Sequence, residues 1–461
     1  MKMNAFLKNP ALLLVAMASF LIAFMGSSLS IALPLIGKDL INNVILLGWL
    51  PTVFVLANTA FLLPFGKLAD IYGRKKVFSY GLVIYTLASL MAALSPSGFF
   101  LIAGSFFQGV GSALIFATGV ALLSSVYPPN RRGEMLGFFV TSVFVGLFLG
   151  PLLGGFLAQN LGWRSIFLFN VPLGLLILIL ITWKLKGEWS GSPGEKFDIR
   201  GSAIYIPSLI ALMYGLTSLN NRTGQLIFIV GIFGIFIFLL LERRSYNPIV
   251  KLEYFKRRIS AFPALAMLLI NISTTALWTL LSLYLQYLLS LSPQITALIL
   301  SVEPLMVALF SPLVGRLSDI MENRIFTVSG MGVTTVGLLV LSTLTINTAL
   351  WTVIIGVILV GVGVALFSPP ATNIFMGSMS RENYGMASAT LSTMIYAGQT
   401  ISLGLLLLIL SNFLGNVQIA PPNFDLFIYS LKTAFTLFAV ITAGGMIISL
   451  FMDKRTNLNK N

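Results

Sequence analysis

The sequence predicts an all-α polytopic membrane protein in which fourteen helices form two six-helix bundles plus two inserted helices. Its 461 residues are 57% hydrophobic and only 9% charged, whereas a soluble globular protein carries about 25% charged residues. Apolar runs of about 20 residues, the length that crosses the hydrocarbon core of a bilayer, recur along the whole chain. Several motifs of the first half recur in the second half, which indicates a duplicated architecture.

Counting the apolar runs gives fourteen spans. With the N-terminus in the cytoplasm, all but four of the 28 Lys and Arg residues fall in cytoplasmic segments, the exceptions being Lys38, Arg164, Arg222 and Lys432. The positive-inside rule therefore places both termini in the cytoplasm and explains the net charge of +14 without nucleic-acid binding. The spans are centred on Phe24, Val55, Thr86, Ser112, Val145, Leu175, Leu209, Phe233, Thr275, Glu303, Thr335, Val362, Gln399 and Val440.

The composition excludes several chemistries. The chain contains no Cys and no His, which rules out disulfides, thiolate nucleophiles and His proton relays. No span carries paired acidic residues suited to metal–diphosphate chemistry. We therefore expect neither an enzyme nor a metal or organic cofactor. A receptor or scaffold is equally disfavoured, because no soluble domain remains to carry a signal.

An internal repeat divides the chain. The stretch Gln-Gly-Val-Gly at 108–111 is echoed by Gly-Val-Gly at 361–363, and Gly146 is echoed by Gly398 at the same offset. Glycines also serve close helix packing in membranes, but the matched spacing favours duplication. Spans one to six then match spans nine to fourteen. The predicted division is an N-terminal bundle over 1–186, an inserted two-helix segment with its linkers over 187–258, and a C-terminal bundle over 259–461.

A charged segment, Gly-Lys-Leu-Ala-Asp-Ile-Tyr-Gly-Arg-Lys-Lys at 66–76, separates the second and third spans, and Gly-Arg-Leu-Ser-Asp at 315–319 repeats its start. We expect Gly66 to allow close approach of helix ends and Asp70 to lie at a helix N-terminus, where the dipole favours a carboxylate. The segment resembles the signature loop of the major facilitator superfamily. That resemblance implies a conformational latch between the two halves, carried here by Gly66, Asp70, Gly73, Arg74, Gly315 and Asp319. Alternatively, the basic residues only set the orientation.

The arrangement of six, two and six spans resembles the fourteen-span drug:proton antiporter branch of that superfamily. In the fifth span, Gly146, Gly150, Pro151, Gly154 and Gly155 resemble the element that this family associates with export. Glycines every four residues make a flat helix face, and the proline lets the helix bend. The second half has Ser402, Leu403 and Leu406 at the places of Gly150, Pro151 and Gly154, so the element points to function rather than to a requirement of the fold.

One acidic residue stands apart. Of the fourteen Asp and Glu residues, only Glu303 falls near the middle of a span. A carboxylate inside the membrane is costly and is by default a candidate functional group. The adjacent Pro304 is expected to break the helix and to open backbone carbonyls to a cavity. Glu303 is thus predicted to bind a proton, a cationic substrate, or both in competition; a structural, hydrogen-bonded glutamate is the alternative.

The chain departs from the antiporter branch at two places. Met25 stands where relatives carry an Asp, and Ser105 stands where they carry an Arg tied to proton coupling. Coupling is therefore either lost or moved to Glu303. We expect about half of the polar residues in the spans to face the substrate, the others bonding neighbouring backbone. The candidates are Ser27, Ser28, Ser30, Asn58 and Gln108 in the first half and Asn271, Thr275, Trp278, Tyr284, Gln286, Asn373, Tyr396 and Gln399 in the second.

These features give two predicted functions on one fold. The first is a proton-driven secondary exporter of lipophilic, cationic compounds, working by alternating access. The second is a flippase for lipids or lipid-linked sugars, or an uncoupled facilitator, which the missing Asp and Arg favour. Either protein is expected to be a multi-pass monomer in the plasma membrane of a prokaryote. Its partners would be small lipophilic or amphiphilic substrates, protons and the lipid bilayer, without nucleic acid.

Overall fold

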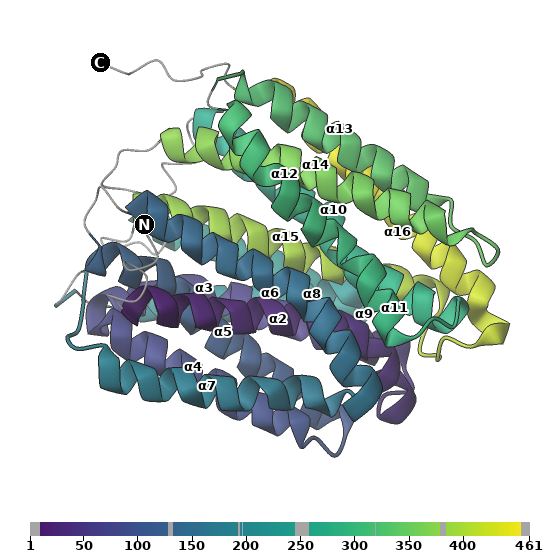
Figure 1. Cartoon of the computed structure of the whole chain (residues 1–461), viewed down its shortest axis with the longest axis horizontal. Helices are drawn as coiled ribbons and strands as arrows, with labels where there is room; N and C mark the ends of the chain where they lie inside the picture. Colours follow the sequence, from purple (N-terminus) through teal and green to yellow (C-terminus); the bar gives the residue numbers. More distant parts are fainter. Residues whose placement is uncertain are drawn as a thin grey trace. The chain divides into compact units, whose positions relative to one another are not determined.

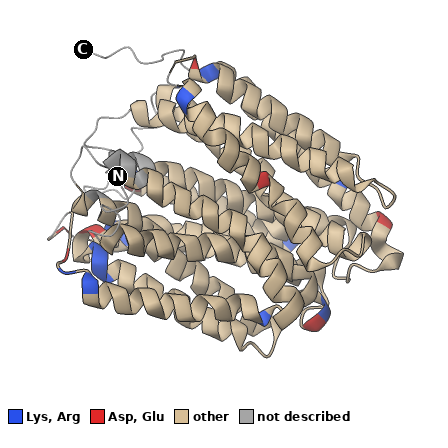
Figure 2. Ribbon diagram, in the orientation of Figure 1, with Lys and Arg blue, Asp and Glu red and all other residues tan. Residues whose placement is uncertain are grey.

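The structure is a computed structural model that describes residues 10–127, 132–191, 194–195, 197–244, 258–318, 320–378 and 384–452. In these residues the regular elements are all helical (Figure 1). Fourteen helices or helix pairs are long and apolar enough to span a membrane, which confirms the predicted number. Charged residues gather mostly at helix ends (Figure 2).

The first compact unit contains almost all of the first eight helices. Their sequences are apolar and rich in Leu and Ile. Inside a bilayer no water is present to bond the backbone N–H and C=O groups, so each segment forms a helix in which these groups bond to one another. The helices are α2 (Pro10–Asp39), α3 (Val44–Tyr72), α4 (Arg74–Ala93), α5 (Gly98–Val126), α6 (Arg132–Leu161), α7 (Arg164–Lys184), α8 (Ile199–Thr217) and α9 (Arg222–Arg244).

The second unit contains the remaining helices. Two of its spans are interrupted: α10 continues into a π-helical turn, and α11 is separated from α12 at Ser301. Its elements are α10 (Arg258–Leu283), η3 (Tyr284–Leu288), α11 (Pro293–Leu300), α12 (Val302–Ser318), α13 (Asn323–Ser342), α14 (Leu350–Gly377), α15 (Tyr384–Phe413), η5 (Pro421–Asn423) and α16 (Phe424–Leu450).

Equivalent helices pack alike in the two units. In the first unit α2 packs on α6 and α4 packs on α5; in the second, α10 packs on α15 and α13 packs on α14. Glycines allow the closest of these approaches. A Cβ atom on Gly111 of α5 would lie 2.6 Å from the Tyr85 nitrogen of α4, and one on Gly363 of α14 would lie 2.6 Å from the Thr334 nitrogen of α13. The predicted duplication therefore has a counterpart in the packing of each unit.

The inserted helices α8 and α9 belong to the first unit. They contact each other closely, since a Cβ atom on Gly215 would lie 2.4 Å from the Phe228 nitrogen. The Tyr205 hydroxyl of α8 donates a hydrogen bond to the Thr59 carbonyl of α3 at 3.4 Å. The three-part division at residues 186 and 258 stays a prediction.

A polar cluster joins the end of α2 to the start of α7. The Asp39 carboxylate accepts hydrogen bonds from Trp163 Nε1 at 2.9 Å and from Arg164 at 2.8 Å. The Arg164 guanidinium also lies over the Trp163 ring, 4.2 Å from its centroid. The indole and the cation therefore share one carboxylate acceptor at this end of the unit.

Candidate functional site

The predicted exporter element forms the face of α6 that packs on α2. A Cβ atom on Gly146 would lie 2.7 Å from the Phe20 carbonyl oxygen, one on Gly150 would overlap Ser27 Oγ, and one on Gly154 would lie 2.6 Å from Ser28 Cβ. The three glycines therefore let the two helices touch along two turns. Gly155 and Pro151 are buried in the same helix.

Serine hydroxyls complete this contact. Ser28 Oγ donates to the Gly150 carbonyl at 2.7 Å, and Ser27 Oγ donates to the Ala23 carbonyl of its own helix at 3.0 Å. Both serines are among the candidates for facing the substrate, about half of which are expected to bond backbone instead. They lie in the α2–α6 contact, because their short side chains fit against a helix face that carries no Cβ atoms.

The second unit builds the same crossing with different chemistry. A Cβ atom on Gly398 of α15 would lie 2.6 Å from the Leu268 carbonyl oxygen of α10, as Gly146 does against Phe20. Ser402, which replaces Gly150, accepts a hydrogen bond from the Ala276 N–H at 3.0 Å. The hydroxyl that α2 supplies in the first unit is thus supplied by the partner helix α15 in the second.

Glu303 lies at another repeated crossing. A Cβ atom on Gly361 of α14 would lie 2.8 Å from the Glu303 carbonyl oxygen of α12. In the first unit, a Cβ atom on Gly109 of α5 would lie 2.3 Å from the Phe54 carbonyl oxygen of α3. Phe54 therefore occupies the equivalent place. Since a phenylalanine serves this crossing in one half, the packing of the fold does not require a carboxylate in the other.

The Glu303 side chain is buried and only partly satisfied. The residue is 9% exposed, and its Oε2 atom has no hydrogen-bond partner among the described residues. The Trp278 side chain on α10 is its hydrogen-bond partner. The predicted helix break is present: α11 ends at Leu300 and α12 begins at Val302. Pro304 has no N–H to offer the carbonyl four residues earlier, which accounts for the break.

The interior of the first unit is polar but uncharged at the two positions where the branch carries charge. Met25 is buried, and its sulfur accepts a hydrogen bond from Asn170 Nδ2 at 3.5 Å. Ser105 is fully buried, and its Oγ atom has no partner among the described residues. Asn170 is also in reach of the Tyr85 hydroxyl, at 3.3 Å. Sequence reasoning did not assign this pair a role, although an asparagine inside an apolar span was a signal.

Two further predicted residues of the first unit join its helices to one another. Asn58 Nδ2 donates to Ser112 Oγ at 2.8 Å, and Gln108 Nε2 donates to Ser89 Oγ at 2.8 Å. The Asn58 Oδ1 atom is buried without a partner among the described residues. Asn58 therefore links α3 to α5, and Gln108 links α5 to α4.

Some of the other cavity candidates form hydrogen bonds within the protein, and the remaining ones are buried or half-buried. Tyr284 is wholly buried, and its hydroxyl donates to the Thr345 carbonyl after α13, so it braces that connection rather than facing a cavity. Asn271, Thr275, Gln286 and Asn373 bond to neighbouring helix atoms. Trp278, Tyr396 and Gln399 are half-buried, and Ser30 is buried.

The signature loop differs from its prediction in two ways, at Asp70 and at Gly66. Helix α3 runs to Tyr72 and α4 begins at Arg74, so Asp70 lies in the last turn of a helix rather than at an N-terminus. The short break at Gly73 follows from its positive φ of 114°. A Cβ atom on Gly66 would meet only Ala117 Cβ at 3.8 Å, and one on Gly315 would meet nothing within 4 Å, so neither glycine is needed for close approach. Asp319 lies outside the described residues.

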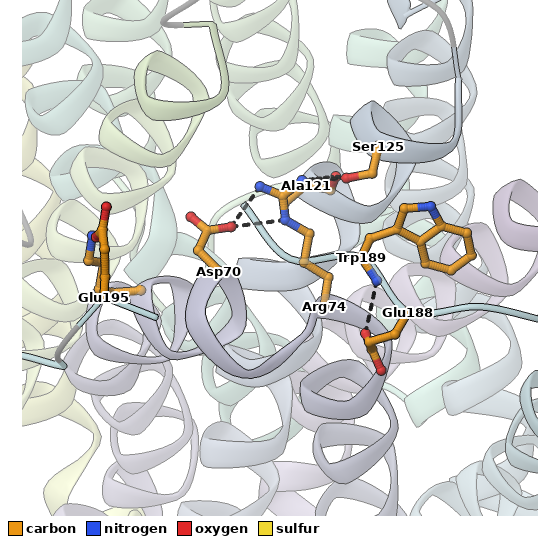
Figure 3. A network of polar contacts seen from close by, with 8 residues as sticks. Asp70, Arg74, Ala121, Ser125, Glu188, Trp189 and Glu195 are labelled. Atoms are coloured by element: carbon orange, nitrogen blue, oxygen red, sulfur yellow. Dashed lines mark hydrogen bonds and ion pairs between the residues drawn. The ribbon is translucent and has the colours of Figure 1, made fainter. Parts of the chain in front are cut away.

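The Asp70–Arg74 pair is nevertheless well formed (Figure 3). Arg74 donates from Nε at 2.9 Å and from a terminal nitrogen at 2.6 Å to the same Asp70 oxygen. It also donates to the Ala121 carbonyl at 3.0 Å and to the Ser125 hydroxyl, both on α5. These bonds tie the end of α3 and the start of α4 to α5 within the first unit. The predicted latch between the two halves stays a prediction.

Fourteen spans, repeated glycine crossings and a buried acid define a duplicated membrane transporter. The chain belongs to the Major Facilitator Superfamily, whose sequence profile matches residues 15–247 and 263–461. Two solved structures share the fold. A peptide transporter POT in complex with sulfate has a TM-score of 0.69 at 17% identity and covers 95% of this chain and 94% of its own. A bacterial homologue of the human lysosomal transporter Spinster has a TM-score of 0.69 at 16% identity, with 95% of each chain covered.

The names of curated relatives are consistent with a transporter function. The riboflavin transporter RibZ of Clostridioides difficile (strain 630) is 26% identical over 97% of this chain and 98% of its own length. The multidrug resistance protein Stp of Mycobacterium tuberculosis (strain CDC 1551 / Oshkosh) is 30% identical over 86% of this chain and 74% of its own. The multidrug transporter protein MdtP of Bacillus subtilis (strain 168) is 26% identical over 87% and 75%. The chain is therefore a multi-pass transporter of small molecules, and its relatives include proteins named for multidrug resistance and multidrug transport.

Proposed function

We propose that this protein is a secondary exporter of lipophilic, cationic small molecules in the plasma membrane, driven by proton antiport. The observation that carries the proposal is Glu303, a buried carboxyl group with one oxygen that lacks a partner among the residues that the structure describes. An unpaired buried carboxylate is costly, and a proton or a cation would offset that cost. Phe54 at the equivalent crossing supports a functional rather than a structural reason for the acid.

Competition at Glu303 accounts for exchange. When the carboxyl group holds a proton it has no charge to offer, and when it is ionised it can hold a cation beside the Trp278 side chain. Because one group binds either partner, each lowers the apparent affinity for the other. Alternating access then converts a proton gradient into substrate efflux. Exchange of one proton for one monovalent cation moves no net charge.

The test is efflux of ethidium from cells, or its uptake into inverted vesicles, with an imposed pH gradient, comparing the intact protein with Glu303→Gln. The glutamine keeps the shape and the bond to Trp278 but cannot ionise. A matched control is Asp425→Asn, which removes an exposed acid in the first turn of α16. We expect efflux and substrate-induced proton movement in the intact protein and the control, and neither in Glu303→Gln. Equal efflux by all three proteins would contradict the proposal.

A second candidate is an uncoupled facilitator or a flippase for amphiphilic lipids on the same fold. Met25 and Ser105 favour it, because the interior positions that carry charge in the antiporter branch are neutral here. Liposomes with a fluorescent lipid or lipid-linked sugar distinguish the two. Movement of that lipid without a pH gradient, together with absent ethidium efflux, would support the second candidate.

A further inference from the structure

Residues 185–191, which lead from α7 toward α8 and are called the strap here, lie along the signature loop (Figure 3). Two backbone hydrogen bonds join them in opposite directions. The Arg74 N–H donates to the Trp189 carbonyl at 2.7 Å, and the Gly191 N–H donates to the Asp70 carbonyl at 3.0 Å. The strap therefore pairs with the backbone of the two residues that form the Asp70–Arg74 ion pair.

Glu188 of the strap caps helix α4. The first N–H groups of any helix have no partner inside it, and the N-cap residue Gly73 has no side chain to supply one. Glu188 Oε1 accepts a hydrogen bond from the Lys75 N–H at 2.8 Å. Together with the Trp189 carbonyl, it satisfies the first two N–H groups of α4. The carboxylate is also favoured there by the helix dipole.

Gly73 and Glu188 are matched to each other. Gly73 has a φ of 114°, and a Cβ atom on it would lie 2.6 Å from the Glu188 carboxyl carbon. A side chain at this position would be strained and would displace the capping carboxylate. The glycine of the signature loop thus has a local reason: it leaves room for an acceptor that comes from more than 100 residues along the chain.

All of these contacts lie within the first unit. The ion pair between Lys67 and Glu195, with an N–O distance of 2.5 Å, adds a link just beyond the strap. Hinge and rocking transitions move packed bodies while contacts inside each body persist. We therefore expect the strap to stay bound to the signature loop when the bundles move.

We propose that Glu188 is a positioning residue for transport. It caps α4, holds the Asp70–Arg74 pair in the geometry that the structure shows, and keeps the strap bound to the signature loop throughout the transport cycle. The inference does not depend on the identity of the substrate or on proton coupling. It adds to the signature loop a fixed partner in the linker that leads to the inserted helices.

The first experiment compares Glu188→Ala with Glu188→Gln in the otherwise intact chain. The amide oxygen of glutamine can still accept the Lys75 N–H, whereas alanine offers no acceptor. We expect amide hydrogen exchange at the start of α4 to speed up about two- to thirtyfold in Glu188→Ala, the range that loss of a helix cap produces, and to return close to wild type in Glu188→Gln. Unchanged exchange in the alanine variant would overturn the capping role, whatever the protein transports.

The same pair of variants tests transport. We expect Glu188→Ala to lower the maximal rate of substrate movement with little change in the half-saturating substrate concentration, and Glu188→Gln to restore the rate. This split distinguishes a positioning role from a general loss of folded protein, which purification yield and monodispersity report separately. A maximal rate in Glu188→Ala equal to that of the intact protein would refute the proposal.

The second experiment uses the absence of cysteine in the chain. Lys67→Cys with Glu195→Cys places two thiols at the ends of the ion pair, and a short bifunctional thiol reagent then links the loop to the segment beyond the strap. We expect the linked protein to transport at the rate of the same variant without reagent. Loss of transport on linking, with recovery when a cleavable linker is reduced, would show that the strap must open and would overturn the proposal.

Discussion

Replacing Glu303 by leucine tests whether its carboxyl group is kept for transport or for folding. The change removes a buried acceptor atom that has no partner in the described part of the chain, and the burial of such an atom costs about 1–3 kcal/mol. It also removes the bond to Trp278, a loss of about 0.5–1.5 kcal/mol. Trp278 is half-buried, so its indole N–H keeps access to other partners. We therefore expect the free energy of unfolding to stay the same or to rise by about 2 kcal/mol.

The assay is reversible unfolding of the purified protein in detergent, followed by tryptophan fluorescence, with efflux measured on the same variants. Glu303→Gln is the neutral control of the same shape. Glu303→Leu should be at least as stable as the intact protein and inactive in efflux. A loss of stability above about 1 kcal/mol would mean that the carboxyl group anchors the fold. Retained efflux would refute its role in transport.

Three further predictions concern the glycine face, the signature loop and the polar cluster at the end of α2. Gly150→Leu should lower stability by about 1–3 kcal/mol or prevent folding, because its side chain would overlap α2. Gly137→Leu on the same helix, where a Cβ atom meets nothing within 4 Å, should leave the stability unchanged. Asp70→Asn should lower transport with membrane expression intact, because it weakens the bond to Arg74. Asp39→Ala should lower stability by about 1–3 kcal/mol, since it leaves a buried indole N–H without its acceptor.

Each of these predictions can fail in a specific way. Thermal unfolding curves that coincide for Gly150→Leu and Gly137→Leu would mean that the α2–α6 contact is not tight. Full transport by Asp70→Asn would show that the signature loop only sets orientation. For Asp39, the control is Arg164→Gln, which removes a half-exposed ion pair and should cost less than about 1 kcal/mol; a larger loss there would place the stabilisation in the ion pair rather than in the indole bond.

The spans and the duplication could be predicted because both depend on local composition and regular spacing. An apolar run of the right length has to be a helix inside a bilayer, and the glycines at 111 and 363 mark the same crossing in both halves. Glu303 was found for the same reason: a charge inside an apolar run is conspicuous. Its partner Trp278 was among the candidates, but spacing alone did not pair the two residues.

The features that the sequence did not predict depend on contacts between segments that are distant along the chain. Asp70 was placed at a helix N-terminus because glycine and charge normally mark a loop, yet the helix continues to Tyr72. The capping of α4 by Glu188 has no local signal, since the donor and the acceptor are 113 residues apart. Tyr284 is one of the cavity candidates, but spacing cannot distinguish a tyrosine that faces substrate from one that bonds a backbone carbonyl, as Tyr284 does.

The hydroxyl at the crossing of the first and fifth helices comes from Ser28 in one half and from Ser402 in the other, and this difference has a consequence for engineering. In one half the first helix donates to the carbonyl of a glycine, and in the other the fifth helix accepts from a backbone N–H. Each half therefore supplies the hydroxyl of this crossing from a different helix. A chimera that moved the fifth helix of one half into the other would bring together two hydroxyls or none at that crossing. The two halves build the same helix crossing, but their fifth helices are not interchangeable parts.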